Sequence, residues 1–319
     1  MKAASAFIVF ALTAACACAA EYPTKPVRIV APFPPGGSVD LIARLVGAEL
    51  SKGLGQQVVI DNRTGASGMI GTELAKNAAP DGYTLLVNTL PFVTNQFAYS
   101  KVPYDPINDF AHVSLLCSVA SVLVSHPALP VNSMKELIAL AKARPGQITY
   151  GTAGAATNPH IAGELLNNVA KIKLTPIHYK GGGPATIATL SGEVQLYFVN
   201  AIPDAMPHVQ VKKLKALGIT AAKRNPAAPQ IPTMAEAGVP GYEFTTWQIL
   251  AAPKATPAPI VAMVNEKVRA SLKTPDTLKR WQDAGFDVIA STPEEMTAHL
   301  NSEIKKWRVV FKEQGIRAE

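Results

Sequence analysis

The architecture of this 319-residue chain follows from one stretch, Val27-Arg-Ile-Val-Ala-Pro-Phe-Pro-Pro-Gly-Gly-Ser-Val-Asp40. Its first five residues are mostly β-branched and apolar, which predicts a buried strand. Prolines and glycines then end the strand, and Ser38 is a good N-cap for an amphipathic helix beginning at Val39. The stretch therefore predicts a strand–loop–helix unit, and open α/β sheets bind ligands at such loops.

The same order of elements recurs later in the chain without sequence repetition. Residues 148–151 form a strand candidate, residues 152–159 a loop with Gly154, and a helical pattern starts at His160. We therefore expect two sheets, each with one glycine-containing loop at its carboxyl edge. The natural arrangement is two lobes whose loops face each other across a cleft.

Short apolar runs alternate with helical patterns along most of the chain, which predicts α/β units on mainly parallel sheets. The strand candidates are residues 27–31, 58–61, 84–88, 113–116, 121–125, 148–151, 175–179, 194–199, 216–220 and 248–251. The helix candidates lie near 39–51, 71–78, 134–143, 160–169, 185–191 and 203–212. Towards the C-terminus, residues 257–272, 275–284 and 293–314 each open with Pro or Thr-Pro, so we expect a helical layer there.

Composition narrows the class of protein. With 48% hydrophobic and 17% charged residues the chain is too apolar to be disordered, and it has room for a sizeable core. The net charge of +7 comes from scattered basic residues that do not interleave with aromatic ones, which argues against nucleic acid as a partner. A modest positive field that attracts small anions fits equally well.

Residues 1–20 have the pattern of a secretory signal peptide, with one lysine, a short apolar stretch and several small residues before the cleavage region. The apolar part is shorter than the roughly 20 residues of a membrane span. Lipidation of Cys16 or Cys18 is an open alternative, although neither follows a leucine at the expected position. Cleavage leaves Cys117 as the one cysteine, so we expect no internal disulfide and a buried thiol.

The loop before residue 39 is suited to a carboxylate. Gly36 and Gly37 leave the backbone free of side-chain bulk, and the unpaired N–H groups at the helix start attract an anion. Asp40 has two open roles, which are to complement the helix dipole or to accept a hydrogen bond from a ligand or water.

The later loop offers Thr157, Asn158 and His160 around a second helix start. Capping alone explains a threonine or an asparagine there, but all three donors together favour an anion site. A third glycine run, residues 179–184, is either a tight turn or a further approach to the same cleft.

Enzyme signatures are missing from the sequence. Residues 65–71 match neither a P-loop nor a dinucleotide fingerprint, and the segment around Ser67 lacks the terminal glycine of the G-x-S-x-G nucleophile elbow. Neither paired Cys/His spacing nor an H-E-x-x-H motif occurs, so no metal or other cofactor is expected. Catalysis remains open only through residues that converge in space.

Many strings in order resemble the substrate-binding proteins of tripartite tricarboxylate transporters, also called Bug receptors. They cover essentially the whole mature chain: Tyr22-Pro-Thr-Lys-Pro-Val-Arg-Ile-Val30, Pro32-Phe-Pro-Pro-Gly-Gly-Ser-Val-Asp40, Asp61-Asn-Arg-Thr-Gly-Ala-Ser-Gly68, Ala79-Pro-Asp-Gly-Tyr-Thr-Leu-Leu86, Pro103-Tyr-Asp-Pro106, His178-Tyr-Lys-Gly-Gly182, Pro232-Thr-Met-Ala-Glu-Ala-Gly238 and Ser291-Thr-Pro-Glu-Glu295. The resemblance implies an α/β, two-lobed periplasmic-binding-protein (Venus flytrap) fold with a hinge between the lobes. It also implies a non-enzymatic periplasmic receptor, expected to be monomeric, that delivers a small organic anion to membrane permease subunits.

The resemblance further implies site residues and lobe boundaries. In the family, two loops hold one ligand carboxylate, partly through water, and the matching positions here are Phe33, Gly36, Gly37, Ser38 and Asp40, then Gly154, Thr157, Asn158 and His160, with Thr89 and Asn200 lining the cleft. The implied boundaries are residues 21–121 plus 248–319 for the first lobe and 122–247 for the second, with Trp247 packed at the hinge. The chain departs from the family pattern at Val199 and Asp204, where an acid and a small residue are common, which leaves the ligand's identity open.

Two other functions stay open beside a receptor for a mono-, di- or tricarboxylate, aromatic acids included. One is a secreted α/β hydrolase or lyase acting on a small organic acid, which should show a nucleophile–base pair or metal ligands. The other is a ligand-sensing partner of a signalling receptor.

Overall fold

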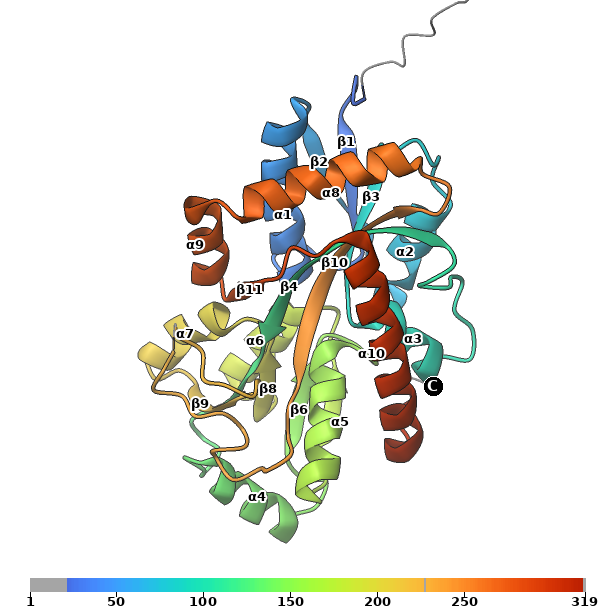
Figure 1. Ribbon diagram of the computed structural model, residues 1–319. Helices are drawn as coiled ribbons and strands as arrows, with labels where there is room; N and C mark the ends of the chain where they lie inside the picture. The colour runs from blue at the N-terminus through green and yellow to red at the C-terminus, as the bar shows by residue number, and fades with distance from the viewer. Residues whose placement is uncertain (1–21, 227, 318–319) are drawn as a thin grey trace, which may run out of the picture.

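The computed structural model describes residues 22–226 and 228–317, which form two α/β lobes, one above the other in Figure 1. The predicted signal peptide, with Cys16 and Cys18, lies outside the described residues. Within the described ranges, no helix combines the length and the apolar character needed to cross a membrane.

The first lobe is built on a six-stranded sheet of order β11-β4-β10-β3-β1-β2 in the described part of the chain. Its strands are β1 (Val27–Ala31), β2 (Val58–Asn62), β3 (Thr84–Thr89), β4 (Phe110–Ala120), β10 (Thr245–Pro253) and β11 (Phe286–Val288). Its helical segments are α1 (Ser38–Leu54), η1 (Ala66–Gly68), α2 (Met69–Lys76), α3 (Pro91–Ala98), α8 (Ala258–Leu272), α9 (Pro275–Asp283) and α10 (Pro293–Gln314).

The second lobe is built on a sheet of order β7-β6-β8-β5-β9. Its strands are β5 (Val122–Ser125), β6 (Thr149–Thr152), β7 (Thr175–His178), β8 (Leu196–Val199) and β9 (Lys215–Ile219). Its helices are α4 (Met134–Ala143), α5 (Asn158–Ala170), α6 (Gly182–Ser191) and α7 (Ile202–Gln210).

The expectation of mainly parallel sheets is wrong. β1 pairs in parallel with β2 and β3, and β6 with β7 and β8, whereas the other strand pairs in the described residues are antiparallel. β4 carries the chain towards the second lobe and β10 carries it back, so these two long strands must run in opposite directions. An apolar run has the same sequence pattern in either direction, and strand polarity is therefore decided only when the chain closes on itself.

Element lengths also differ from expectation at the centre of the molecule. β4 runs over eleven residues instead of the expected 113–116, and the sequence did not predict α3 or β11. The three C-terminal helices are confirmed almost to the residue. They carry strong start signals, such as the reciprocal capping box between Thr292 and Glu295 at the start of α10.

The cores follow the amphipathic patterns. Ile42, Val46 and Leu50, spaced four apart on α1, are all fully or almost fully buried against the first sheet. Cys117 is fully buried there, as expected, and burial raises the pKa of its thiol, which keeps it protonated and unreactive. α10 packs against β4, α3 and α5, and Figure 1 shows it running down beside both lobes.

Candidate functional site

The first loop, residues 32–37, connects the end of β1 to the start of α1. Gly37 is the N-cap residue of α1, and no side chain caps the helix. The expectation that Ser38 is the N-cap is therefore wrong by one position, because the chain becomes helical at Ser38 itself. The backbone N–H groups of the first turn face the loop without a side-chain partner, which suits an anion.

Asp40 shapes the first loop from inside. The residue is 3% exposed, and its carboxylate accepts hydrogen bonds from the Gly36 N–H at 3.0 Å, the Asn62 amide at 3.0 Å and the Arg44 guanidinium at 2.9 Å. Burial alone would raise the pKa of Asp40, but these hydrogen bonds outweigh it and lower the pKa. Asp40 lies in the first turn of α1, where an acid complements the helix dipole, and its hydrogen bond to Gly36 adds a further role, which is to hold the first loop in place.

The second loop, residues 153–157, connects β6 to α5. Thr157 is the N-cap residue of α5, but its hydroxyl donates to the Gly154 carbonyl at 2.7 Å and makes no side-chain cap bond. His160 lies behind the loop, where its Nδ1 accepts from the Ala156 N–H at 2.9 Å. Gly154 and His160 thus form part of the loop's framework.

A third helix start completes the arrangement. α6 begins at Gly182 with Gly181 as N-cap and no side-chain cap. The backbone of Gly181 approaches the Pro34 ring of the first loop so closely that a Cβ atom there would lie 2.9 Å from Pro34 Cγ. The sequence left two interpretations of the glycine run at 179–184, a tight turn or an approach to the cleft, and in the structure the run is a turn that also approaches the first loop.

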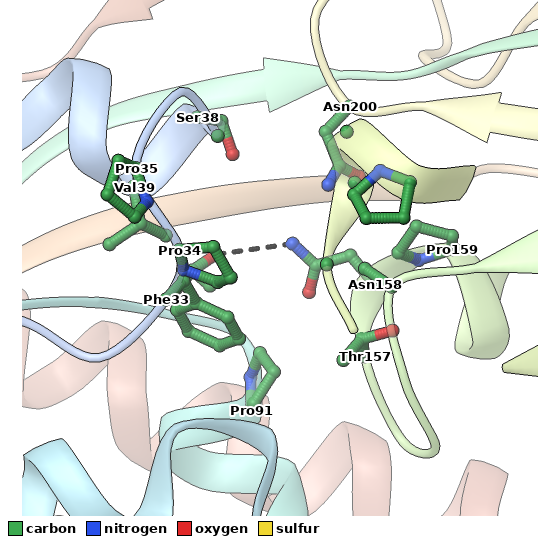
Figure 2. Close-up of a pocket in the computed structure, with 17 residues that line it drawn as sticks. Phe33, Pro34, Pro35, Ser38, Val39, Pro91, Thr157, Asn158, Pro159 and Asn200 are labelled. Atoms are coloured by element: carbon green, nitrogen blue, oxygen red, sulfur yellow. Dashed lines mark hydrogen bonds between the residues drawn. The ribbon is translucent and has the colours of Figure 1, made fainter. Parts of the chain in front are cut away.

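Between these loops lies a cavity of about 610 Å³, counting the part open to solvent. In Figure 2, Phe33, Pro34, Pro35, Ser38, Val39 and Pro91 face Thr157, Asn158, Pro159 and Asn200 across it. The other lining residues are Gly37, Thr89, Ala153, Gly181, Gly182, Gly183 and Pro184. Among the described residues, no charged side chain lines this cavity.

The structure brings together most of the site residues expected from the sequence. Seven of them line the cavity: Phe33, Gly37, Ser38, Thr89, Thr157, Asn158 and Asn200. Gly36, Asp40 and His160 do not, and Gly154 lines a neighbouring cavity of about 850 Å³ that also borders Phe33 and Tyr99. Sequence reasoning missed Pro91 at the start of α3 and the proline rings in general. Pro91 lies two residues after the carboxyl end of β3, and because ligands bind at the carboxyl ends of strands in open α/β sheets, this position was the signal that could have identified it.

Direct contacts join the two lobes at this cavity and at the neighbouring one. The Asn158 amide nitrogen donates to Thr89 Oγ1 at 3.4 Å, the bond drawn in Figure 2. Ser67 donates to the carbonyl of Ala155, and the Tyr99 hydroxyl lies 3.4 Å from the same carbonyl. The cavity is therefore lined by residues from both lobes.

The electrostatics of the cavity come from the backbone. The N-terminal ends of α1, α5 and α6 converge on it, and each carries a partial positive charge without a capping side chain. In the described part of the chain, no group of three or more His, Cys, Asp or Glu side chains could hold a metal ion. The cavity thus combines the partial positive charge of helix starts with a largely apolar lining.

His160 makes the second loop sensitive to pH. The residue is 5% exposed, its ring packs edge-on against the His178 ring with centroids 4.9 Å apart, and its Nε2 lies 4.0 Å from Glu164 Oε1. Burial, together with the neighbouring His178, lowers the pKa of His160 to about 4. The ring is therefore neutral at pH 7, which leaves Nδ1 free to accept the Ala156 bond.

We expect the free energy of unfolding to fall as the pH drops from about 6.5 to about 4. In this window the unfolded chain protonates His160, whose usual pKa is about 6.5, while the folded chain resists protonation, at a cost on the order of 3 kcal/mol. His160→Asn keeps an acceptor for the Ala156 N–H but does not titrate, so its pH dependence should be shallower. Urea unfolding at a series of pH values measures both, and identical pH profiles would contradict the assignment.

Two α/β lobes joined by crossing strands, with an anion-suited cavity between them, define a solute receptor with the periplasmic-binding-protein fold. A sequence profile described as the tripartite tricarboxylate transporter family receptor matches residues 42–316. The chain belongs to this family of receptors, and it is accordingly a binding protein and not an enzyme.

Individual relatives agree with this assignment. BugT of Bordetella pertussis is 34% identical over 313 residues, which cover 98% of this chain and 96% of BugT. Rpa4515 of R. palustris, solved with adipate, is 36% identical with a TM-score of 0.89, covering 92% of this chain and 99% of that one. MatC from Rhodopseudomonas palustris, solved with malate, is 33% identical with a TM-score of 0.85, covering 91% and 99%. Receptors of this family are periplasmic, and they serve a membrane transporter.

Proposed function

We propose that the cavity lined by Phe33, Ser38 and Asn158 binds a small organic carboxylate and presents it to the membrane permease of a tripartite transporter. The observation that carries the proposal is the convergence of three uncapped helix starts on one cavity without charged side chains. Backbone N–H groups and helix dipoles bind a carboxylate without a basic side chain. Adipate in Rpa4515 and malate in MatC are ligands of the same chemical kind.

The individual site residues have distinct proposed roles. Ser38 and Asn200 face each other across the cavity in Figure 2 and supply side-chain donors, while Phe33 and the neighbouring proline rings contact the ligand's apolar body. Gly36, Asp40, Gly154 and His160 act indirectly by fixing the two loops. A lining so rich in rings also suits aromatic acids, which we include among the candidate ligands.

We further propose that the lobes divide after residue 121 and again near residue 245. β4 ends in the first sheet at Ala120 and β5 begins in the second at Val122. On the return, the Phe244 N–H donates to Thr220 in the second lobe, whereas Thr245 already pairs with Ala120 in the first sheet, slightly before the expected Gln248. Closure of the cleft would then bend the chain at these two points between the lobes. We also propose that the protein is a monomer and that residues 1–20 direct its export.

A thermal-shift screen of the mature chain tests the proposed function. Mono-, di- and tricarboxylates, aromatic acids and amino acids are compared with the uncharged amide of each acid. A true ligand at about 100 times its dissociation constant should add about 2.7 kcal/mol of stability, and its amide should not. If no organic acid raises the melting temperature, or if an acid is chemically converted during the assay, the proposal fails.

A further inference from the structure

Two amide oxygens of cavity-lining residues lack a hydrogen-bond partner among the described residues: Asn158 Oδ1 and Asn200 Oδ1. Of the two residues, Asn158 is the more deeply buried. Asn158 is 4% exposed, and its side-chain oxygen Oδ1 is buried without any hydrogen-bond donor. Leaving a buried acceptor unpaired is costly, and such atoms in native proteins call for a partner. Because Asn158 lines the cavity, that partner can come from a ligand.

The orientation of the Asn158 amide is fixed by Thr89. The Thr89 hydroxyl donates its one hydrogen to the Trp247 carbonyl at 2.8 Å, so its oxygen can only accept from Asn158. The amide nitrogen, which lies 3.4 Å away, must therefore point at Thr89, and the oxygen must point elsewhere. Figure 2 shows the nitrogen on the dashed bond to Thr89 and the oxygen turned away from that bond.

The donors of the cavity wall include the N–H groups at the helix starts and the side chains of Ser38 and Asn200, but in the described residues none of them pairs with this oxygen. Five prolines line the cavity and have no backbone N–H: Pro34, Pro35, Pro91, Pro159 and Pro184. An ionised carboxylate only accepts hydrogen bonds, so the acid group of a ligand cannot satisfy Asn158 Oδ1 either. The donor is therefore either a water molecule or a second group on the ligand.

We propose that the physiological ligand is a carboxylate carrying its own hydrogen-bond donor, a hydroxyl or an N–H, which donates to Asn158 Oδ1. This inference rests on the proposed function, since it presumes that the cavity binds a carboxylate. Asn158 then acts as the residue that separates hydroxy and amino acids from plain acids of the same skeleton. Discrimination of this type is strong because a plain acid leaves the buried oxygen unpaired.

Isothermal titration with matched pairs of acids tests the inference. The pairs are lactate and propionate, alanine and propionate, malate and succinate, and the hydroxybenzoates with benzoate. We expect the donor-bearing acid of at least one pair to bind at least about tenfold more tightly to the unaltered protein. In Asn158→Leu this ratio should fall to about one, whereas Ser38→Ala should weaken both members of the pair and keep the ratio.

A second pair of variants guards against misfolding of Asn158→Leu. Thr89→Val removes the acceptor that orients the amide, so the discrimination should drop, and Thr89→Ser keeps the hydroxyl and should preserve it. Equal affinity within every pair for the unaltered protein would overturn the inference while leaving the proposed function intact. If no acid binds at all, both fall together. A ratio that persists in both Asn158→Leu and Thr89→Val would also overturn the inference.

Discussion

Gly181→Ala should weaken carboxylate binding by at least about tenfold, because it places a methyl group between the lobes. The new Cβ would lie 2.9 Å from Pro34 Cγ and within 3.6 Å of two further atoms of that rigid ring. Pro34 belongs to the first lobe and Gly181 to the second, so relief requires the cleft to open. Titration calorimetry measures the affinity, and small-angle scattering with saturating ligand should report a wider particle than for the unaltered protein.

The backbone strain of this substitution can be separated from its effect on the cleft. Gly181 has φ +117°, a conformation that costs alanine about 1–3 kcal/mol wherever it occurs. Gly238 has φ +110° and would meet only the flexible side chain of Lys135, at 3.1 Å. Gly238→Ala should therefore lose comparable stability but retain full affinity. Unchanged affinity in Gly181→Ala would mean that the close contact with Pro34 is not part of the bound state.

Trp307→Ala should destabilise the protein by about 3–5 kcal/mol, the usual cost of removing a buried tryptophan. The ring is 1% exposed and packs edge-on against Phe244, with centroids 5.9 Å apart. Its Nε1 donates to Glu303 at 2.8 Å, and the same carboxylate oxygen accepts from Trp247 Nε1 at 3.0 Å. The substitution therefore loosens α10 where it packs beside the expected hinge residue Trp247.

Two further variants calibrate this prediction by urea unfolding. Trp307→Phe keeps most of the packing and loses the hydrogen bond, so its loss of stability should fall between those of the parent and Trp307→Ala. Val309, two positions along the same helix, is 52% exposed, and Val309→Ala should change stability by less than about 0.5 kcal/mol. A loss below about 1 kcal/mol for Trp307→Ala would show that α10 contributes little to holding the lobes.

Helix starts and the two glycine-containing loops at the cavity could be predicted from the sequence because their signals are local. Glycines and prolines end β1 and β6, and the helices that follow begin within two residues of the expected positions. α10 begins at the expected residue because Thr292 and Glu295 cap it reciprocally over a distance of only three positions.

Other parts of the site could not be predicted, because they depend on partners that are distant in the sequence. Asp40 lies inside its loop since Asn62 reaches it from the neighbouring strand β2. The open acceptor of Asn158 is likewise created by Thr89, 69 residues earlier, and by Trp247 beyond it. A single sequence carries no signal for contacts between side chains that lie so far apart along the chain.

The sequence by itself determined that the chain alternates strands and helices and that glycine loops precede helix starts, and it carries neither a metal-binding motif nor a catalytic motif. Those properties follow from conformational preferences and hydrogen-bonding capacities within a few residues of each other. Only the tertiary structure decided which strands run antiparallel, which side chains face the cavity and which support it from behind. These depend on how the chain crosses twice between the lobes, and long-range packing sets that geometry.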